Sequence, residues 1–399
     1  MAEVIPWQQL TILLTVAVAS HFAFRRFQLP TIIGEILIGI ALGQILGSGF
    51  WDSTFTGTFA ALGAIVLLFI IGLESDIKSI YSGRNVAVAT GGVLLPWVAG
   101  FLLAEFMLPA EPFASKIFVG AIMVATSTAI TAAVLLEMNA LRSEVAKTII
   151  GAAVVDDILG LIVLSLSNGL ASGTLDAVRL VLIASGALLF IGVGLFVGLR
   201  YFSVLVTLAD KWGGRSKLKN AGFVIALGLT FLYASMANLV GLHPIVGAFL
   251  AGAILSKSKL NSDLQQGAEY IGAIFTPIFF VSLGIQVEIM TVDAGLLLFG
   301  IAAAAVAILA KVIGCWIPAR LSGLSKDESL AVGIGMAPRG EVGLVIASAA
   351  IISGSLYSVM VLAVIITTII PPPFFKRCMR RLVKDELERQ LAAIEQEPR

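Results

Sequence analysis

Long apolar runs alternate with short polar loops along nearly the whole chain. A helix of about 20 apolar residues is long enough to cross the hydrocarbon core of a bilayer. The pattern predicts about thirteen such spans, with boundaries placed to within about 2–4 residues. They are expected at residues 7–26, 30–46, 58–73, 86–107, 117–138, 147–170, 179–207, 219–240, 243–256, 269–288, 293–318, 328–353 and 355–374.

Composition strengthens this interpretation. The chain is 58% hydrophobic and only 13% charged, with a mean hydropathy of +1.02. Those values predict an all-α polytopic membrane protein surrounded by a lipid bilayer, and they exclude a soluble globular domain. A net charge of +1 gives no case for nucleic-acid binding. No nucleophile–base set or phosphate-binding loop indicates an enzyme, and no cofactor is expected.

Basic residues are distributed unequally between the two sets of predicted loops. One set and the C-terminal tail hold most of the lysines and arginines, whereas the opposite set holds only Lys116 and Arg179. Cytoplasmic loops carry an excess of Lys and Arg, so the N-terminus is expected outside and the C-terminus in the cytoplasm. A first span without a basic leader is expected to stay as an anchor, in the cell (plasma) membrane.

Two glycine-containing motifs occur twice in the same order. Gly34-EILIG resembles Gly247-AFLAG, and Gly72-LESDI resembles Gly284-IQVEI. The copies lie seven spans apart, and an odd offset reverses the direction of a helix through the membrane. Chance similarity between glycine-rich helices is the alternative, but the matching order favours inverted repeats. Inverted repeats around a site at the bilayer midplane are typical of secondary transporters.

The repeats define the predicted organisation of the chain. Residues 1–375 form a single transmembrane unit, and residues 376–399 form a short charged cytoplasmic tail. Within the unit, repeat one covers about residues 7–170, a linker helix covers 179–207, and repeat two covers 219–374.

Asp156 and Asp157 lie side by side in the middle of the span at 147–170. An aspartate at the centre of a membrane helix costs about 2.5–3.5 kcal/mol, so two of them need partners or a function. Lys311, in the span at 293–318, is the partner that the sequence offers. Consecutive helix residues point about 100° apart, so one aspartate should face Lys311 and the other a water-filled cavity. A static salt bridge is the alternative, but it leaves the second aspartate unexplained.

Two spans carry residues that disrupt a helix. The span at 117–138 contains a hydroxyl-rich run with Thr126, Ser127 and Thr128. In the span at 328–353, Pro338 and Gly340 flank Arg339 and precede Glu341.

The two disrupted spans are seven apart and therefore equivalent in the repeat. Two opposed broken helices are expected to cross near the midplane, where freed carbonyls and the hydroxyls help to coordinate an ion, and Arg339 and Glu341 compensate the helix ends. Hydroxyls that bond back to their own helix are the alternative for the first run. His243, beside Pro244, is expected to cap a helix or to lie at an interface.

These motifs together resemble the cation/proton antiporter-2 family, and most closely sodium/proton antiporters of the NapA type. The resemblance rests on Ala153-VVDDILGLIVL, Gly247-AFLAG, Lys311 and Val332-GIGMAPRGEVGL, and it extends over nearly the whole chain. It implies an antiporter fold with two crossed broken helices, and a homodimer with a dimerisation domain and a mobile core. The core helices would lie at about residues 86–170 and 293–374.

The same resemblance assigns roles to the charged residues. Asp157 matches the carboxylate that binds the ion and the proton, and Asp156 matches the partner of the buried lysine. The expected function is electrogenic Na⁺/H⁺ exchange, with Na⁺ (or Li⁺) held by Asp157 and Asp156. A K⁺/H⁺ antiporter of the same family and a Na⁺-coupled organic-anion symporter are the alternatives.

Overall fold

The described part of the protein consists of helices joined by short connections. We used a computed structural model, which describes residues 6–26, 31–47, 50–51, 53–75, 82–172, 177–215, 220–285, 294–350, 352 and 354–395. All regular elements among these residues are helices, which confirms the all-α prediction. Within the described ranges, nine helices are long and apolar enough to cross a membrane.

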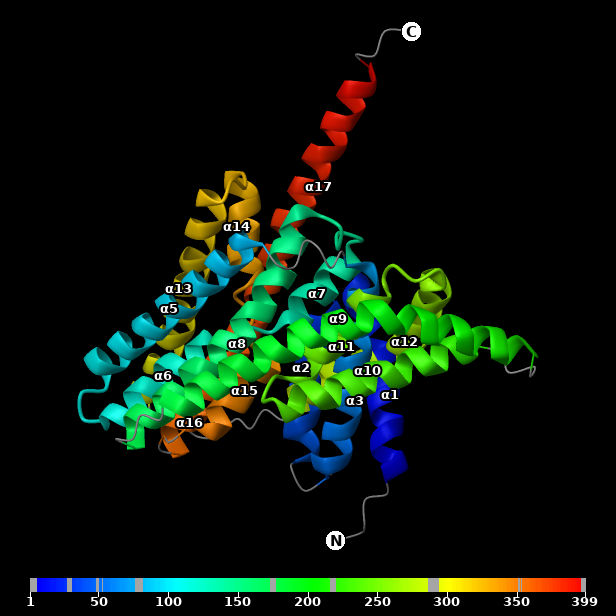
Figure 1. Ribbon diagram of the computed structural model, residues 1–399. Coiled ribbons are helices and arrows are strands. Elements are labelled where there is room, and N and C mark those ends of the chain that lie inside the picture. The colour runs from blue at the N-terminus through cyan, green and yellow to red at the C-terminus, as the bar shows by residue number, and fades with distance from the viewer. Residues whose placement is uncertain are drawn as a thin grey trace.

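The helices are numbered along the chain as in Figure 1. Their bounds are α1 (Pro6–Arg26), α2 (Thr31–Leu46), α3 (Ser53–Glu74), α5 (Gly83–Met107), α6 (Phe113–Val124), α7 (Thr128–Glu137), α8 (Glu144–Ser172), α9 (Ala177–Arg215), α10 (Ala221–Leu239), α11 (Pro244–Leu255), α12 (Asn261–Ile285), α13 (Ala294–Leu321), α14 (Lys326–Gly335), α15 (Gly340–Ala349), α16 (Gly354–Ile369) and α17 (Pro371–Glu395).

Each predicted span overlaps one helix, or a pair of short helices where a break was expected, except the span at 355–374, which overlaps α16 and the first residues of α17. The main differences are at polar ends. Helix α12 begins at Asn261 instead of near residue 269, and α9 continues to Arg215 instead of ending near 207. A helix that leaves the hydrocarbon need not end there, so hydropathy alone misplaces such boundaries. For the same reason α17 runs through residue 376, where the tail was expected to begin, and projects from the bundle (Figure 1).

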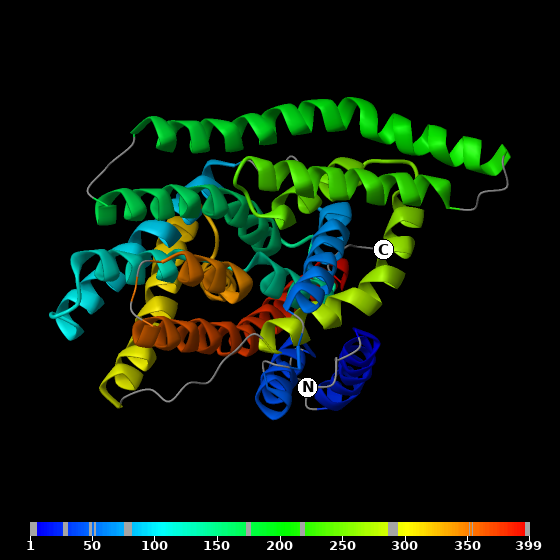
Figure 2. The same ribbon diagram turned by 90° about the horizontal axis from the view of Figure 1, so that it is seen from below.

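The helices form two bundles. In the first, here called the site bundle, α5 packs against α6, α8 and α13, and α13 packs against α14 and α16. In the second, the flanking bundle, α2 and α3 pack against α12, α3 and α10 pack against α11, and α9 packs against α10. Figure 2 shows α9 running along one long edge of the molecule, next to α10.

Glycines let the helices of the flanking bundle approach closely. A β-carbon on Gly39 of α2 would overlap the backbone of Gly284 in α12, and the reverse holds as well. Gly72 of α3 and Gly252 of α11 make the same kind of contact. In the two recurring motifs, Gly39 occupies the same position as Gly252, and Gly72 the same position as Gly284. The contacts Gly39–Gly284 and Gly72–Gly252 are therefore two copies of one contact. We propose that the inverted repeat survives in this packing.

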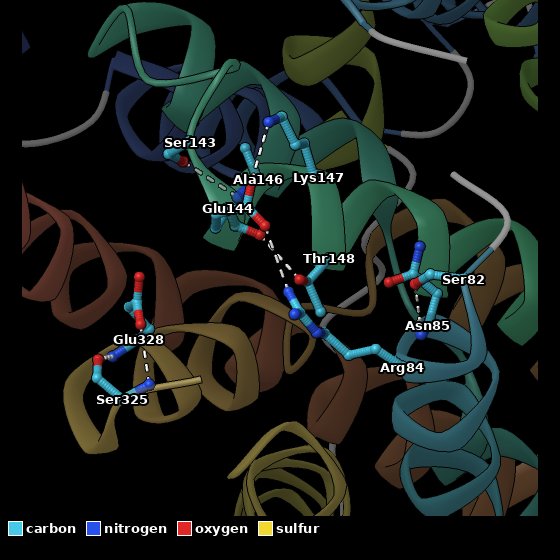
Figure 3. A network of polar contacts seen from close by, with 10 residues as sticks. All are labelled: Ser82, Arg84, Asn85, Ser143, Glu144, Ala146, Lys147, Thr148, Ser325 and Glu328. Carbon is cyan, nitrogen blue, oxygen red and sulfur yellow. Dashed lines mark hydrogen bonds and ion pairs between the residues drawn. The ribbon is translucent and has the colours of Figure 1, made fainter. Parts of the chain in front are cut away.

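The ends of three site-bundle helices carry a polar network (Figure 3). Glu144, in the first turn of α8, accepts bonds from Arg84 of α5 at 3.3 Å and from Lys147 at 2.9 Å. A negative charge there is also favoured by the helix dipole. Ser325 and Glu328 form a capping box that starts α14, each binding the backbone N–H of the other. These contacts fix where α8 and α14 begin, and thereby the register of the residues deeper in the bundle.

The close glycine contact predicts a sharp difference between two Gly→Ala substitutions. Gly252→Ala places a methyl group against the Phe69 carbonyl and should destabilise the fold by about 1–3 kcal/mol. Gly228→Ala, on α10, meets no atom within 4 Å and should be neutral or stabilising by about 0.5–1 kcal/mol. Thermal unfolding of both purified variants in one detergent is the measurement. Equal melting temperatures would contradict the proposed tight contact.

Candidate functional site

Two helices are interrupted in the middle of the site bundle, as the sequence predicts. Helix α6 ends at Val124, and Ala125 and Ser127 have extended backbones before α7 begins at Thr128. Helix α14 ends at Gly335, and α15 begins at Gly340. Pro338 explains the second break, because it lacks an N–H and disfavours a helical conformation in the residue before it.

The two breaks satisfy each other's backbone. The Ser127 N–H donates to the Pro338 carbonyl at 2.8 Å, directly from one break to the other. The Thr126 hydroxyl donates to the Met336 carbonyl at 3.3 Å, and the Thr131 hydroxyl donates to the Gly335 carbonyl at 2.5 Å. Backbone groups inside a membrane have no water to bind, so this exchange is what allows non-helical chain at that depth.

Gly340 is required by its backbone and by its surroundings. Its φ of +51° lies in the left-handed region, which L side chains adopt at a cost. A β-carbon there would press on the side chain of Ser127. The Gly340 N–H donates to the Thr368 hydroxyl at 3.0 Å, so α16 satisfies the start of α15.

A buried ion pair lies beside the first break. Lys311 of α13 donates to Asp156 Oδ1 at 2.7 Å and to the Val124 carbonyl at 2.9 Å. The side chains of Lys311 and Asp156 are 0% and 2% exposed. The sequence identified this lysine as the partner of one aspartate, and the structure shows that the aspartate is Asp156.

Arg339 also lies at the end of α6. Its guanidinium is buried and donates to the carbonyls of Met123, Ala307 at 3.2 Å and Ala337 at 3.0 Å. Met123 and Val124 end α6, so Arg339 and Lys311 bind the last carbonyls of this half-helix. Positive charge at a helix C-terminus complements the helix dipole and the unpaired carbonyls.

Asp157 has a different environment from Asp156. It is half-buried, and both aspartates line a cavity of about 190 Å³ together with Thr126 and the turn between α10 and α11. Asp157 also lines a space of about 10 Å³ with Thr128 and Ile150. Ile150 in turn lines a second cavity of about 410 Å³, which Asp157 itself does not line.

The structure brings most of the predicted site residues together at the crossing. Glu341 is the exception, because its side chain lies outside the described residues. Sequence reasoning missed Thr131 and Thr368, which resemble any other hydroxyl in a membrane helix until their partners are known. It also missed the pairing of Glu137 with Lys376 at 2.6 Å and of Glu105 with Lys116 at 3.0 Å. Their partners lie on other helices, so no local pattern marks them.

A bundle with two crossed broken helices and a buried Asp–Lys pair is the design of a secondary ion transporter. The chain belongs to the sodium/hydrogen exchanger family. The family model for the transmembrane sodium/hydrogen exchanger matches residues 10–378, which is nearly the entire membrane part.

Curated relatives extend over most of the chain. A Na⁺/H⁺ antiporter of Enterococcus hirae is 36% identical over 377 residues, covering 92% of this chain and 95% of its own length. The Na⁺/H⁺-K⁺ antiporter GerN of Bacillus cereus is 31% identical, covering 92% and 94%. The high-affinity Na⁺/H⁺ antiporter NhaS3 of Synechocystis is 34% identical, covering 84% and 74%.

The fold matches a solved structure. The sodium proton antiporter MjNhaP1 from Methanocaldococcus jannaschii aligns with TM-scores of 0.59 and 0.65 in two determinations. The alignments cover 97% and 98% of this chain, and 98% of MjNhaP1 in both, at 19% and 18% sequence identity. At that identity the likeness supports the antiporter fold, which the sequence predicted.

The hydroxyl contacts between the breaks predict a specific loss of stability. Thr131→Val keeps the shape of the side chain but leaves the buried Gly335 carbonyl without its donor, at a cost of about 1–3 kcal/mol. Thr230→Val removes a hydroxyl that only bonds back to Ala226 in its own helix and should cost less than about 0.5 kcal/mol. Unfolding temperatures of the two variants test this difference. A Thr131→Val protein as stable as Thr230→Val would mean that the Thr131 bond is not required.

Proposed function

We propose that the protein is an electrogenic Na⁺/H⁺ antiporter that works by alternating access. The observation that carries this proposal is the pairing of Asp156 with Lys311 next to a second aspartate, Asp157, which lines the cavity. A purely structural salt bridge needs only one carboxylate and one amine. Asp157 adds a second carboxylate at membrane depth beside the same cavity, and its oxygens are the kind of ligand that a hard cation prefers.

The geometry suggests how a cation and protons compete. Na⁺ is a hard cation that prefers oxygen ligands, and Asp157, Asp156 and nearby carbonyls supply them without a cofactor. When Na⁺ enters, Asp157 gives up its proton and the Asp156–Lys311 pair loosens. When Na⁺ leaves, the pair closes again and Asp157 takes up a proton. Two protons per Na⁺ requires that Lys311 also releases one, which would make each cycle carry net charge.

The cavities support access from alternate sides. The cavity of about 190 Å³ reaches the aspartates from the α10–α11 turn. The cavity of about 410 Å³ reaches Ile150. Phe249 lines the narrow space that Ile150 and Asp157 also line. We propose that the site bundle (about residues 86–170 and 293–374) moves against the flanking bundle. That motion would close the first path and open the second.

The proposed cation is Na⁺. The Enterococcus hirae and Synechocystis relatives carry the name of Na⁺/H⁺ antiporters, whereas GerN is named for both Na⁺ and K⁺. K⁺/H⁺ exchange is therefore the second candidate, and Li⁺ is a plausible further substrate. A Na⁺-coupled organic-anion symporter fits less well, because the cavity at the aspartates is lined mainly by apolar side chains.

We also propose a homodimer in the plasma membrane, with the N-terminus outside and the C-terminus in the cytoplasm. The asymmetry of basic loops supports the orientation. Helices α9 and α10 offer an apolar outer face for lipid or for a second copy, with Leu188, Leu189, Phe196 and Leu232 exposed.

Transport by Asp157→Asn is the direct test of the function. In proteoliposomes with an internal pH dye and a clamped membrane potential, Na⁺ should release the imposed pH gradient with the wild-type protein. Asp157→Asn keeps the shape but cannot exchange a proton, so the response should fall by at least about a hundredfold, in keeping with loss of a proton-transfer group. A response to K⁺ alone would favour the second candidate. No cation response in either protein would contradict antiport.

The voltage dependence of transport distinguishes two roles of Lys311: release of a proton in each cycle, or a purely structural salt bridge. Lys311→Gln removes the amine that would release the second proton, so residual exchange should become insensitive to membrane potential. The variant should also lose about 3–5 kcal/mol of stability, because Asp156 is left buried without its partner. The double variant with Asp156→Asn should recover part of that loss. Unchanged voltage dependence in Lys311→Gln would make Lys311 a structural brace.

A further inference from the structure

His243 belongs to the flanking bundle and yet lines the same cavity as Asp156 and Asp157. It precedes α11, in the N-cap position, with φ −65° and ψ 137°. The expected capping role is not what the structure shows. Its backbone carbonyl accepts the Val246 N–H at 3.0 Å, but its side chain makes no capping bond.

One nitrogen of the imidazole is left unsatisfied by the described residues. Its Nδ1 atom is buried and has no hydrogen-bonding partner among the residues that the structure describes. A buried polar atom without a partner is costly, so its retention needs a reason. The imidazole lines a cavity that has room for several water molecules and holds two carboxylates.

The rest of that wall is mostly apolar, so each polar side chain on it matters. Apart from His243 and Asn238, the flanking bundle contributes Gly241, Leu242 and Pro244 to the cavity. From the site bundle come the aspartates and Thr126, among apolar side chains such as Leu161, Leu164 and Ile346. A cation that enters here must lose water against a mostly apolar surface before it reaches Asp157.

We propose that His243 is a positioning residue for the transported cation. It holds the water shell of the cation through its imidazole as the cation passes from the α10–α11 side to Asp157. The imidazole acts through water, because a bridging water can replace a direct hydrogen bond at little cost. This inference rests on the proposed antiport, and it adds a residue of the flanking bundle to a site otherwise built by the site bundle.

The role is specific to one side of the membrane. When the site bundle moves and the aspartates face the cavity at Ile150, His243 no longer shares a cavity with them. Loss of the imidazole should therefore weaken the apparent affinity for Na⁺ added on the α10–α11 side, and should not change it on the other side.

Three variants test this inference in right-side-out and everted membrane vesicles, which expose opposite faces. His243→Leu removes the polar atoms and should raise the KM for Na⁺ about five- to tenfold on one face only, with kcat within about twofold. His243→Gln keeps hydrogen-bonding atoms at the cavity and should restore a KM near that of the wild type. Thr230→Val, on α10 and away from the cavity, removes a hydroxyl that bonds back to Ala226 in its own helix and should leave the KM unchanged.

The contrary outcomes are distinct. A KM in His243→Leu that is unchanged, or raised equally on both faces, would overturn the inference. A His243→Gln variant as impaired as His243→Leu would also overturn it, because hydrogen bonding to water would then not be the function. A wild-type protein without Na⁺-dependent proton movement would instead refute the proposed antiport. That measurement is made in the same vesicles and is independent of any His243 variant.

Discussion

The arrangement of this protein depends on one constraint: backbone that leaves the helical conformation inside a membrane must find hydrogen bonds within the protein. The two breaks meet this constraint mutually, with Ser127 bonded to the Pro338 carbonyl and Thr131 bonded to the Gly335 carbonyl. Neither break is stable alone at that depth. Their crossing is therefore a consequence of the breaks themselves, and it fixes where the ends of the four half-helices meet.

The charged residues follow from the same constraint. The last carbonyls of α6 accept hydrogen bonds from Lys311 and Arg339, and each carbonyl reduces the cost of burying a positively charged side chain. Lys311 is thus already partly satisfied by the Val124 carbonyl when its bond to Asp156 opens. In the proposed mechanism this second acceptor would let Asp156 turn to the transported cation without leaving the Lys311 amine unpaired. A salt bridge with no such second acceptor would be far harder to open.

Much of this could be predicted from the sequence. Apolar runs located the helices, Pro338 and the Thr126–Ser127 pair located both breaks, and Lys311 was the evident partner for an aspartate. Two kinds of fact could not be predicted from the residue pattern alone. The choice of Asp156 over Asp157 depends on helix rotation, which neighbouring helices set, and only the family resemblance pointed to Asp156. The contacts of Thr131 and Thr368 depend on partners far away along the chain, and the place of His243 beside the aspartates depends on how α11 packs.

The glycine contacts connect this site to movement. The pairs Gly39–Gly284 and Gly72–Gly252 join helices of the flanking bundle with backbone against backbone, and Gly91 and Gly314 do the same for α5 and α13 in the site bundle. Such contacts leave little side-chain volume to rearrange, so each bundle is stiff. Between the bundles the aspartates face cavities instead of packed backbone. The proposed movement would therefore follow that boundary, so that Asp157 exchanges one cavity for the other while the crossing itself stays intact.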